Sequence, residues 1–153
     1  MSGLAKILCD RGFTVSGSDV KRSDLTDHLK SLGCKINIGQ RKDNITSDID
    51  LVIYTAAVHD DNEELMEVKK RALPLMTRAQ LLGQMMDNFE NSIAVAGTHG
   101  KTTTTSMISS VLINADMDPS ISVGGILGII GGNVKAGSSD IFVTEACEYT
   151  NSF

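Results

Sequence analysis

Tryptophan is absent from this sequence of 153 residues, and aromatic residues make up only 4% of it. This scarcity argues against recognition of nucleic acids by base stacking on aromatic side chains. The formal net charge is −5, so no basic face is expected to attract a phosphate backbone. We therefore expect no nucleic-acid partner.

Long apolar runs are also missing, and none approaches the roughly 20 residues that a membrane-spanning helix needs. The first residues, Met1–Cys9, show no basic segment ahead of an apolar one, which is the pattern of a secretory signal. The three cysteines, Cys9, Cys34 and Cys147, are odd in number and lack C-x-x-C spacing. They suit a reducing compartment and predict no zinc site. We expect a cytoplasmic protein without a membrane partner.

Apolar and polar segments alternate in a pattern that predicts an α/β fold with mostly parallel sheets. Ser23, either Asp61 or Asn62, and the pair Thr77 and Gln80 have the residue types and positions of helix caps. In the first half we expect helices at 2–11, 23–33 and 62–71, strands at 13–19, 35–38 and 50–55, and a short extended piece at 73–76. The second helix is expected to bury Leu25, Leu29 and Leu32.

A polar stretch, residues 87–91, interrupts this pattern and predicts a domain boundary. We assign residues 1–90 to a first domain and 91–153 to the start of a second. In the second domain we expect strands at 93–96, 121–123 and 140–145, and a helix at 101–115 that buries Met107, Ile108, Val111 and Leu112. The glycine-rich residues 124–132 are interpreted as a flexible loop in preference to a second phosphate site.

A glycine loop between the predicted strand and helix of the second half is the most informative stretch. Gly97 and Gly100 permit a tight turn and a close approach of backbone to ligand. The helix behind them directs free N–H groups and its positive dipole end at that ligand, as in sites for nucleotide phosphates. Lys101 would reach the β- and γ-phosphates, and Thr102 would ligate Mg²⁺. The predicted nucleotide-binding residues are Gly97, Thr98, His99, Gly100, Lys101, Thr102 and Thr103.

The strict phosphate-loop pattern G-x-x-x-x-G-K-[ST] is not met, because its first glycine would fall at Val95. The alternative interpretation is a strand-to-helix turn whose glycines serve geometry alone. The order of apolar strand, Gly-Lys-Thr and helix favours the phosphate site. The role of His99 stays open.

Glu145 ends the last predicted strand, and Glu148 follows shortly behind it. Ligands of open α/β sheets bind at the carboxyl ends of strands, so Glu145 would face the nucleotide if its strand neighbours the strand before the glycine loop. There it could help to hold Mg²⁺, which prefers oxygen ligands. Residue type alone favours ordinary loop carboxylates for both positions.

The first half carries a weaker binding signal. Asp19 ends the strand at 13–19 and is placed to contact a ribose or a base, although a strand-end turn explains Ser-Gly-Ser-Asp equally well. Gly3 can be only the tail of a dinucleotide-type glycine loop. Thr55 and Ala56, at the end of another strand, are lesser candidates for the same surface.

Several of these segments resemble the Mur ligases. The specific parts are Gly97–Thr105 and Glu145–Phe153, with weaker support from Met1–Ala5, Ser16–Asp19 and Arg78–Leu82, so the resemblance extends over essentially the whole chain. The form of this loop with a histidine at position 99 is similar to that of the branch of the family that joins L-alanine to UDP-N-acetylmuramate.

The resemblance implies a Rossmann-like first domain that binds the UDP part of the substrate, with Gly3, Asp19, Thr55 and Ala56 as contacts, followed by the start of a P-loop ATP-binding domain. It implies a ligase of peptidoglycan synthesis that uses ATP and Mg²⁺ and forms an acyl phosphate. Lys101 would be catalytic, and Thr102 and Glu145 would hold the metal. The terminal segment departs from the more usual Glu-Ala-Asp-Glu-Ser-Asp at Cys147, Tyr149 and Thr150, so no role is assigned to Glu148.

Mur ligases have three domains and several hundred residues. By that comparison the chain lacks a first strand with its glycine loop, most of the central domain and the carboxyl-terminal domain, and we expect little or no ligase activity from it alone. Two alternatives stay open. One is a ligase of the same superfamily that recycles muropeptides by attaching a tripeptide. The other is a truncated nucleotide-binding module with no reaction of its own. The sequence does not predict the oligomeric state.

Overall fold

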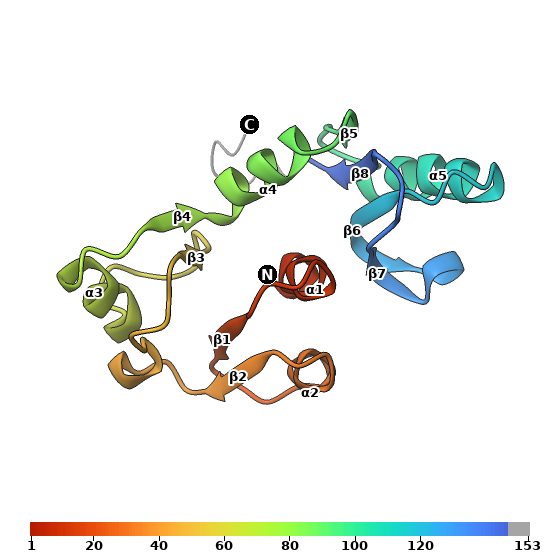
Figure 1. Ribbon diagram of the computed structural model, residues 1–153. Helices are drawn as coiled ribbons and strands as arrows, with labels where there is room; N and C mark the ends of the chain where they lie inside the picture. Colours follow the sequence, from red (N-terminus) through yellow and green to blue (C-terminus); the bar gives the residue numbers. More distant parts are fainter. Residues whose placement is uncertain (147–153) are drawn as a thin grey trace. The chain divides into compact units, whose positions relative to one another are not determined.

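A computed structural model describes residues 1–146 of the chain. These residues form two compact units, Met1–Leu81 and a second unit that begins at Leu82 (Figure 1). The residues behind Ala146, which include Glu148 and most of the predicted terminal motif, lie outside the described part. The assignment of residues 1–90 and 91–153 to two domains stays a prediction.

The first unit contains two pairs of parallel strands with helices between the strands. β1 pairs with β2, and β3 pairs with β4, in two separate sheets. The elements are α1 (Ser2–Asp10), β1 (Ser16–Asp19), α2 (Asp24–Ser31), β2 (Lys35–Ile38), the 3-10 helix η1 (Lys42–Asn44), β3 (Val52–Tyr54), α3 (Glu63–Lys70) and β4 (Leu75–Thr77). The next helix, α4 (Arg78–Asp87), begins in this unit and ends in the second.

The predicted helix starts are confirmed. The Ser23 side chain accepts a hydrogen bond from the Thr26 N–H at 3.3 Å, and the Thr26 hydroxyl accepts one from the Ser23 N–H at 2.9 Å. Asn62 caps α3 through its side-chain oxygen. Thr77 and Gln80 form a reciprocal box, with bonds of 2.8 and 3.2 Å between the backbone N–H of each and the side chain of the other. Each cap pairs N–H groups that a helix start otherwise leaves unpaired.

The predicted burial of α2 is partly wrong. Leu25 is 50% exposed, whereas Leu29 and Thr26 are buried. The reason is that α2 packs on α1 and β2 with the face that carries Thr26 and Leu29. Cys34, just behind α2, is also buried, and its burial together with a hydrogen bond to the Cys9 thiol raises its pKa to about 12. A thiol in that state stays protonated and packs as a small apolar group.

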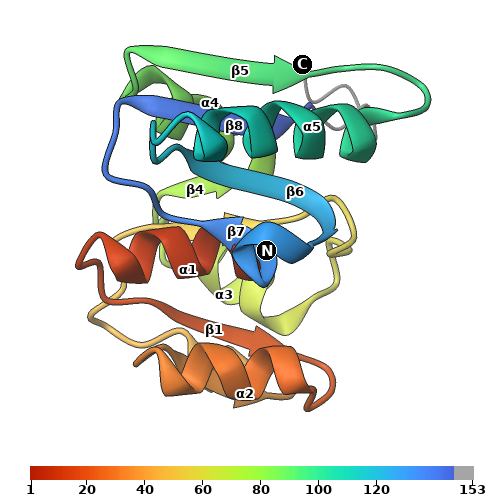
Figure 2. The same ribbon diagram turned by 90° about the vertical axis from the view of Figure 1, so that its right-hand side faces the viewer.

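The second unit is built on a four-stranded sheet with the order β5-β8-β6-β7, in which only β7 runs antiparallel to its neighbour (Figure 2). α5 packs across β5, β8 and β6. The elements are β5 (Asn91–Val95), α5 (Lys101–Asn114), β6 (Ser120–Leu127), the 3-10 helix η2 (Gly128–Ile130), β7 (Gly132–Lys135) and β8 (Ile141–Glu145). The parallel pairs in both units confirm the predicted α/β class with mostly parallel sheets.

Two predictions for the second unit are wrong. Residues 124–132 are not a flexible loop, because Gly124 and Gly125 continue β6 and the chain then returns as β7. The predicted buried face of α5 is wrong in part, since Ile108 and Leu112 are half-buried but Met107 and Val111 are 64% and 68% exposed. The face toward the sheet carries Thr105 and Ser109 instead, both 0% exposed. Their small side chains let the helix lie close to the strands.

Within residues 1–146, no helix is long and apolar enough to cross a membrane. The same part of the chain holds no group of three or more His, Cys, Asp or Glu side chains placed to bind a metal together.

Candidate functional site

The glycine loop, residues 96–100, connects the carboxyl end of β5 to the start of α5. Gly97 has φ = +148° and Gly100 has φ = +76°, and both values fall in the region that favours glycine. Gly100 is the N-cap of α5, so the chain enters the helix from a left-handed residue. The two glycines permit this turn as the sequence predicted.

The N-terminus of α5 has the character of an anion site. Its N-cap has no side chain to cap the helix, and the first turn contains no acidic residue. The N–H groups of the first turn therefore keep their hydrogen-bonding capacity for a ligand, at the positive end of the helix dipole. The Lys101 ammonium folds back over the loop and donates to the Gly97 carbonyl oxygen. A positive side chain and free backbone donors thus occupy one loop, with Thr98, His99, Thr102 and Thr103 exposed beside them.

Glu145 lies at the carboxyl end of β8, directly beside the end of β5. The two strands pair in parallel, with Val95 opposite Glu145, and the Ala146 N–H donates to the Val95 carbonyl at 2.9 Å. The sequence predicted that Glu145 lies near the glycine loop if β5 and β8 are neighbouring strands, and the structure shows that they are. Its Oε1 atom accepts a hydrogen bond from the Gly124 N–H at 2.8 Å, which fixes the carboxylate over β6.

Gly124 and Gly125 are adjacent residues of β6, and they lie against the side chains of Glu145 and Thr102. The sequence did not predict a role for them at this site. A Cβ atom on Gly124 would lie 3.0 Å from Glu145 Oε2, and one on Gly125 would lie 3.2 Å from Thr102 Cγ2. A side chain at either strand position would press against its neighbour, Glu145 at one and Thr102 at the other. The signal in the sequence was the adjacent glycine pair at the end of a predicted strand, which we interpreted as a loop.

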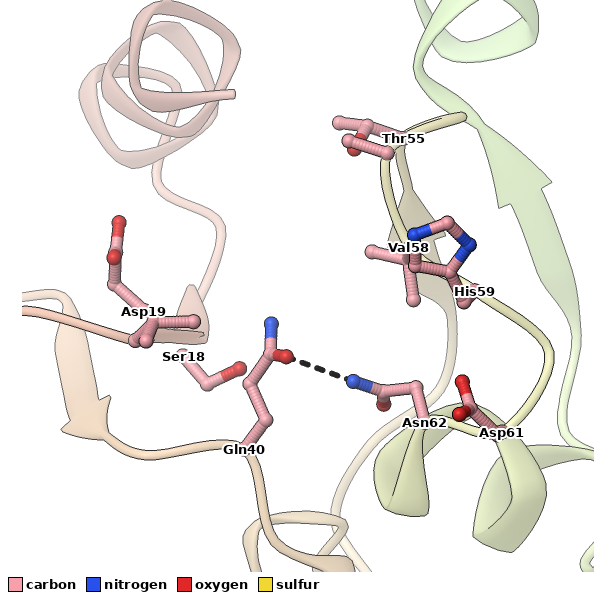
Figure 3. A pocket seen from close by; sticks show the side chains of 10 residues that line it. Ser18, Asp19, Gln40, Thr55, Val58, His59, Asp61 and Asn62 are labelled. Carbon is pink, nitrogen blue, oxygen red and sulfur yellow. Dashed lines mark hydrogen bonds between the residues drawn. The ribbon is translucent and has the colours of Figure 1, made fainter.

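A second candidate site is a cavity of about 450 Å³ in the first unit (Figure 3). It lies at the carboxyl ends of β1 and β3, where ligands of parallel sheets bind. β1 contributes Ser18 and Asp19, and the segment behind β3 contributes Thr55 and His59. Asn62, the cap of α3, also lines it.

Two of the four predicted substrate residues line this cavity. Asp19 and Thr55 line this cavity, whereas Gly3 and Ala56 are not among the residues that line it. Asp19 also serves the alternative role, because its Oδ1 accepts from the Lys21 N–H at 3.1 Å in a strand-end turn. Asp19 therefore both lines the cavity and closes a strand-end turn.

Five polar residues that line the cavity were not predicted as substrate contacts: Ser18, Gln40, His59, Asp61 and Asn62. Gln40 Oε1 accepts a hydrogen bond from Asn62 Nδ2 at 2.8 Å, and Figure 3 shows this bond crossing between the two sides of the cavity. Gln40 follows β2 and His59 follows β3, so the rule that placed Asp19 and Thr55 at strand ends would have found both.

Comparison with known proteins gives a consistent result. The sequence model of the "Mur ligase family, catalytic domain" matches residues 1–90. The chain is 62% identical over 153 residues to the UDP-N-acetylmuramate–L-alanine ligase of Agathobacter rectalis and 59% identical to that of Clostridium kluyveri. All of this chain is covered in both matches, but only 33% and 34% of those relatives. The chain thus spans about a third of the length of the curated relatives that it matches.

Solved structures show the same likeness. A UDP-N-acetylmuramate–alanine ligase from Thermotoga maritima superposes with a TM-score of 0.86 at 34% identity, covering 95% of this chain and 34% of that one. A UDP-N-acetylmuramate:L-alanyl-γ-D-glutamyl-meso-diaminopimelate ligase from Neisseria meningitides superposes with a TM-score of 0.87 at 29% identity, covering 97% of this chain and 49% of that one.

Proposed function

Since the chain belongs to the Mur ligase family, we propose that it serves the ATP-dependent joining of L-alanine to UDP-N-acetylmuramate in peptidoglycan synthesis. The observation that carries this proposal is the placement of the glycine loop and Glu145 at the ends of two paired strands. The names of the relatives support the substrate assignment. In the proposed reaction the substrate carboxylate takes the γ-phosphoryl group of ATP, and the alanine amine then displaces phosphate to form the amide.

The glycine loop is the proposed site for the ATP phosphates. The N–H groups of the first turn of α5 would donate to phosphate oxygens, and Lys101 would leave the Gly97 carbonyl to neutralise the β- and γ-phosphates. Both effects stabilise the charge that spreads over the phosphoryl group during its transfer. This is the role in which we propose Lys101 as the catalytic residue, with Gly97, Thr98, His99, Gly100, Thr102 and Thr103 forming the rest of the loop.

The residues beside the loop fit a magnesium ion. Thr102 and Glu145 offer a hydroxyl and a carboxylate oxygen, and Gly124 and Gly125 keep open the space around both side chains. Mg²⁺ usually takes one or two protein carboxylates and fills its other positions with water and substrate phosphates. Two protein oxygens are therefore enough here. When bound, the ion would neutralise phosphate charge, and the part of Thr102 and Glu145 is to hold it beside the loop.

The cavity of the first unit is the proposed site for the UDP part of the substrate. Its position at the ends of β1 and β3 and its polar lining support this assignment. Asp19 and Thr55 would accept or donate hydrogen bonds to the ribose and base, and Gln40, His59 and Asn62 add further polar contacts. We propose Gly3 and Ala56 only as neighbours of this site, since neither is among the lining residues.

We expect the isolated chain to bind nucleotides but to release no phosphate in a substrate-dependent way. It spans about a third of the relatives' length, and by resemblance a carboxyl-terminal domain holds ATP and the amino acid. The measurement is phosphate release with Mg-ATP, UDP-N-acetylmuramate and L-alanine, compared with reactions that omit each substrate. Release that requires both UDP-N-acetylmuramate and L-alanine would contradict the expected inactivity. Release that requires a tripeptide in place of alanine would favour a muropeptide-recycling ligase.

A further inference from the structure

Glu64 joins the two sides of the cavity without lining it. It stands in the first turn of α3, and its carboxylate is partly buried. Glu64 Oε2 accepts a hydrogen bond from the Ser18 hydroxyl at 2.6 Å, and Oε1 accepts one from the Asn44 side-chain amide at 2.6 Å. Ser18 belongs to β1 and Asn44 to η1, so the two bonds tie the start of α3 to the end of β1 and to η1, which packs against α3.

These bonds reach two residues of the cavity lining. Ser18 itself lines the cavity. The second path runs through Asn44, whose amide also donates to the Gly39 carbonyl at 2.9 Å. The Gly39 N–H in turn donates to the Asp19 carbonyl at 2.8 Å. Through Ser18 and through this chain of bonds, Glu64 holds the end of β1 that presents Ser18 and Asp19 to the cavity.

A second bridge lies beside the first. Asn62 donates to Gln40 across the cavity, as Figure 3 shows, and its oxygen also accepts from the Glu64 N–H at 3.0 Å. Asn62 therefore caps α3 and also ties the start of this helix to Gln40, which follows β2. With the cap already supplied by Asn62, the Glu64 carboxylate is not needed to begin the helix. Its two short bonds instead connect α3 to β1 and η1.

We propose that Glu64 is a positioning residue that holds the walls of the cavity at the spacing a uridine diphosphate requires. This inference rests on the proposed function, which assigns the cavity to the UDP part of the substrate. Glu64 acts through Ser18 and Asn44 and does not contact the nucleotide. Hydrogen bonds to a charged acceptor are stronger than those between neutral groups. Removing this carboxylate therefore frees Ser18 and Asn44, and the walls of the cavity are then no longer held at a fixed spacing.

The test measures uridine diphosphate binding by calorimetry in the full 153-residue chain. Glu64→Ala is expected to raise the dissociation constant about tenfold, because both wall contacts are lost. Glu64→Gln is expected to restore most of the affinity, since its oxygen can accept from Asn44 and its amide can donate to the Ser18 hydroxyl. Asp24→Ala is the matched control, because Asp24 is an exposed carboxylate in the first turn of α2, and it is expected to leave the affinity unchanged.

Mg-ATP affinity, measured on the same samples, separates positioning from a general loss of structure. We expect it to stay unchanged in Glu64→Ala. If Glu64→Ala fails to fold, Asn44→Ala removes one of the two bonds from outside the cavity lining and is expected to weaken uridine diphosphate binding about threefold. Equal affinity of the wild type and of the variant that folds would overturn the positioning role alone. Failure of the wild-type chain to bind uridine diphosphate would overturn the assignment of the cavity, and this inference with it.

Discussion

Replacing Lys101 by alanine is expected to raise the dissociation constant of Mg-ATP about 100-fold, which corresponds to roughly 2.7 kcal/mol. Lys101 is the first residue of α5, and its ammonium donates a hydrogen bond to the carbonyl of Gly97 in the glycine loop. The same helix start carries the free N–H groups. A triphosphate in the loop would replace that neutral acceptor with charged oxygens. The bond that the variant loses is therefore a charge-assisted one, in a site built from backbone donors.

Calorimetry with Mg-ATP on wild-type and variant chains provides the measurement. Lys30→Ala is the control, because Lys30 is an exposed lysine of α2, in the first unit. Both substitutions remove one positive charge, so a general effect of net charge on a polyanion would appear in both. An unchanged affinity in Lys101→Ala would refute the phosphate site, and an equal loss in both variants would reduce it to non-specific attraction.

Replacing Glu145 by glutamine is expected to weaken ATP binding on the order of 30-fold when Mg²⁺ is present, or roughly 2 kcal/mol. The substitution keeps the shape of the side chain but removes the charge that a hard cation prefers. When a chelator removes Mg²⁺, the substitution is no longer expected to weaken ATP binding. The carboxylate then only repels the triphosphate, so Glu145→Gln should bind free ATP at least as tightly as the wild type does.

Two further variants sharpen this test. Glu90→Gln is the control, since Glu90 is exposed and precedes β5, at the end of the strand opposite the glycine loop. Gly124→Ala leaves the charge in place but puts a methyl group 3.0 Å from Glu145 Oε2, and should reproduce part of the loss in Mg²⁺-dependent affinity. If Glu145→Gln weakens binding equally with and without Mg²⁺, the carboxylate is not a metal ligand.

Local signals in the sequence predicted local structure well. The cap at Ser23, the cap at Asn62 and the box of Thr77 and Gln80 depend on residues within one helix turn, and the structure contains all three. The same holds for the left-handed turn at Gly100, where the residue type states the backbone requirement directly. Interactions of this range are encoded in neighbouring residues and need no knowledge of the tertiary fold.

Predictions that depend on distant partners failed more often. The apolar stripe of α5 named Met107 and Val111 as buried, but the sheet packs on the Thr105 and Ser109 side. Periodicity reports that a stripe exists, whereas the neighbouring element decides which stripe is covered. Gly124 was interpreted as part of a loop, because the glycine pair alone does not reveal that Glu145, 21 residues away, lies against it.

The candidate sites follow the same division. Asp19 and Thr55 were found from their positions at strand ends, and both line the cavity. Glu64 was not found, because its importance lies in bonds to Ser18 and Asn44, which are 46 and 20 residues away along the chain. Glu145 was placed correctly beside the glycine loop by the rule for parallel strands, and its register with Val95 gives that rule a specific contact.

The proposed function depends most on the binding of the ATP phosphates by residues 97–103, which comprise the glycine loop and the first turn of α5. A titration of the ¹⁵N-labelled chain with Mg-ATP, followed by amide chemical shifts, tests it most directly. We predict that the largest shifts occur at the amides of Gly100, Lys101, Thr102 and Thr103, and that Lys101→Ala abolishes them at the same nucleotide concentration. Saturable shifts confined to other parts of the chain, with these loop amides unmoved, would contradict the claim.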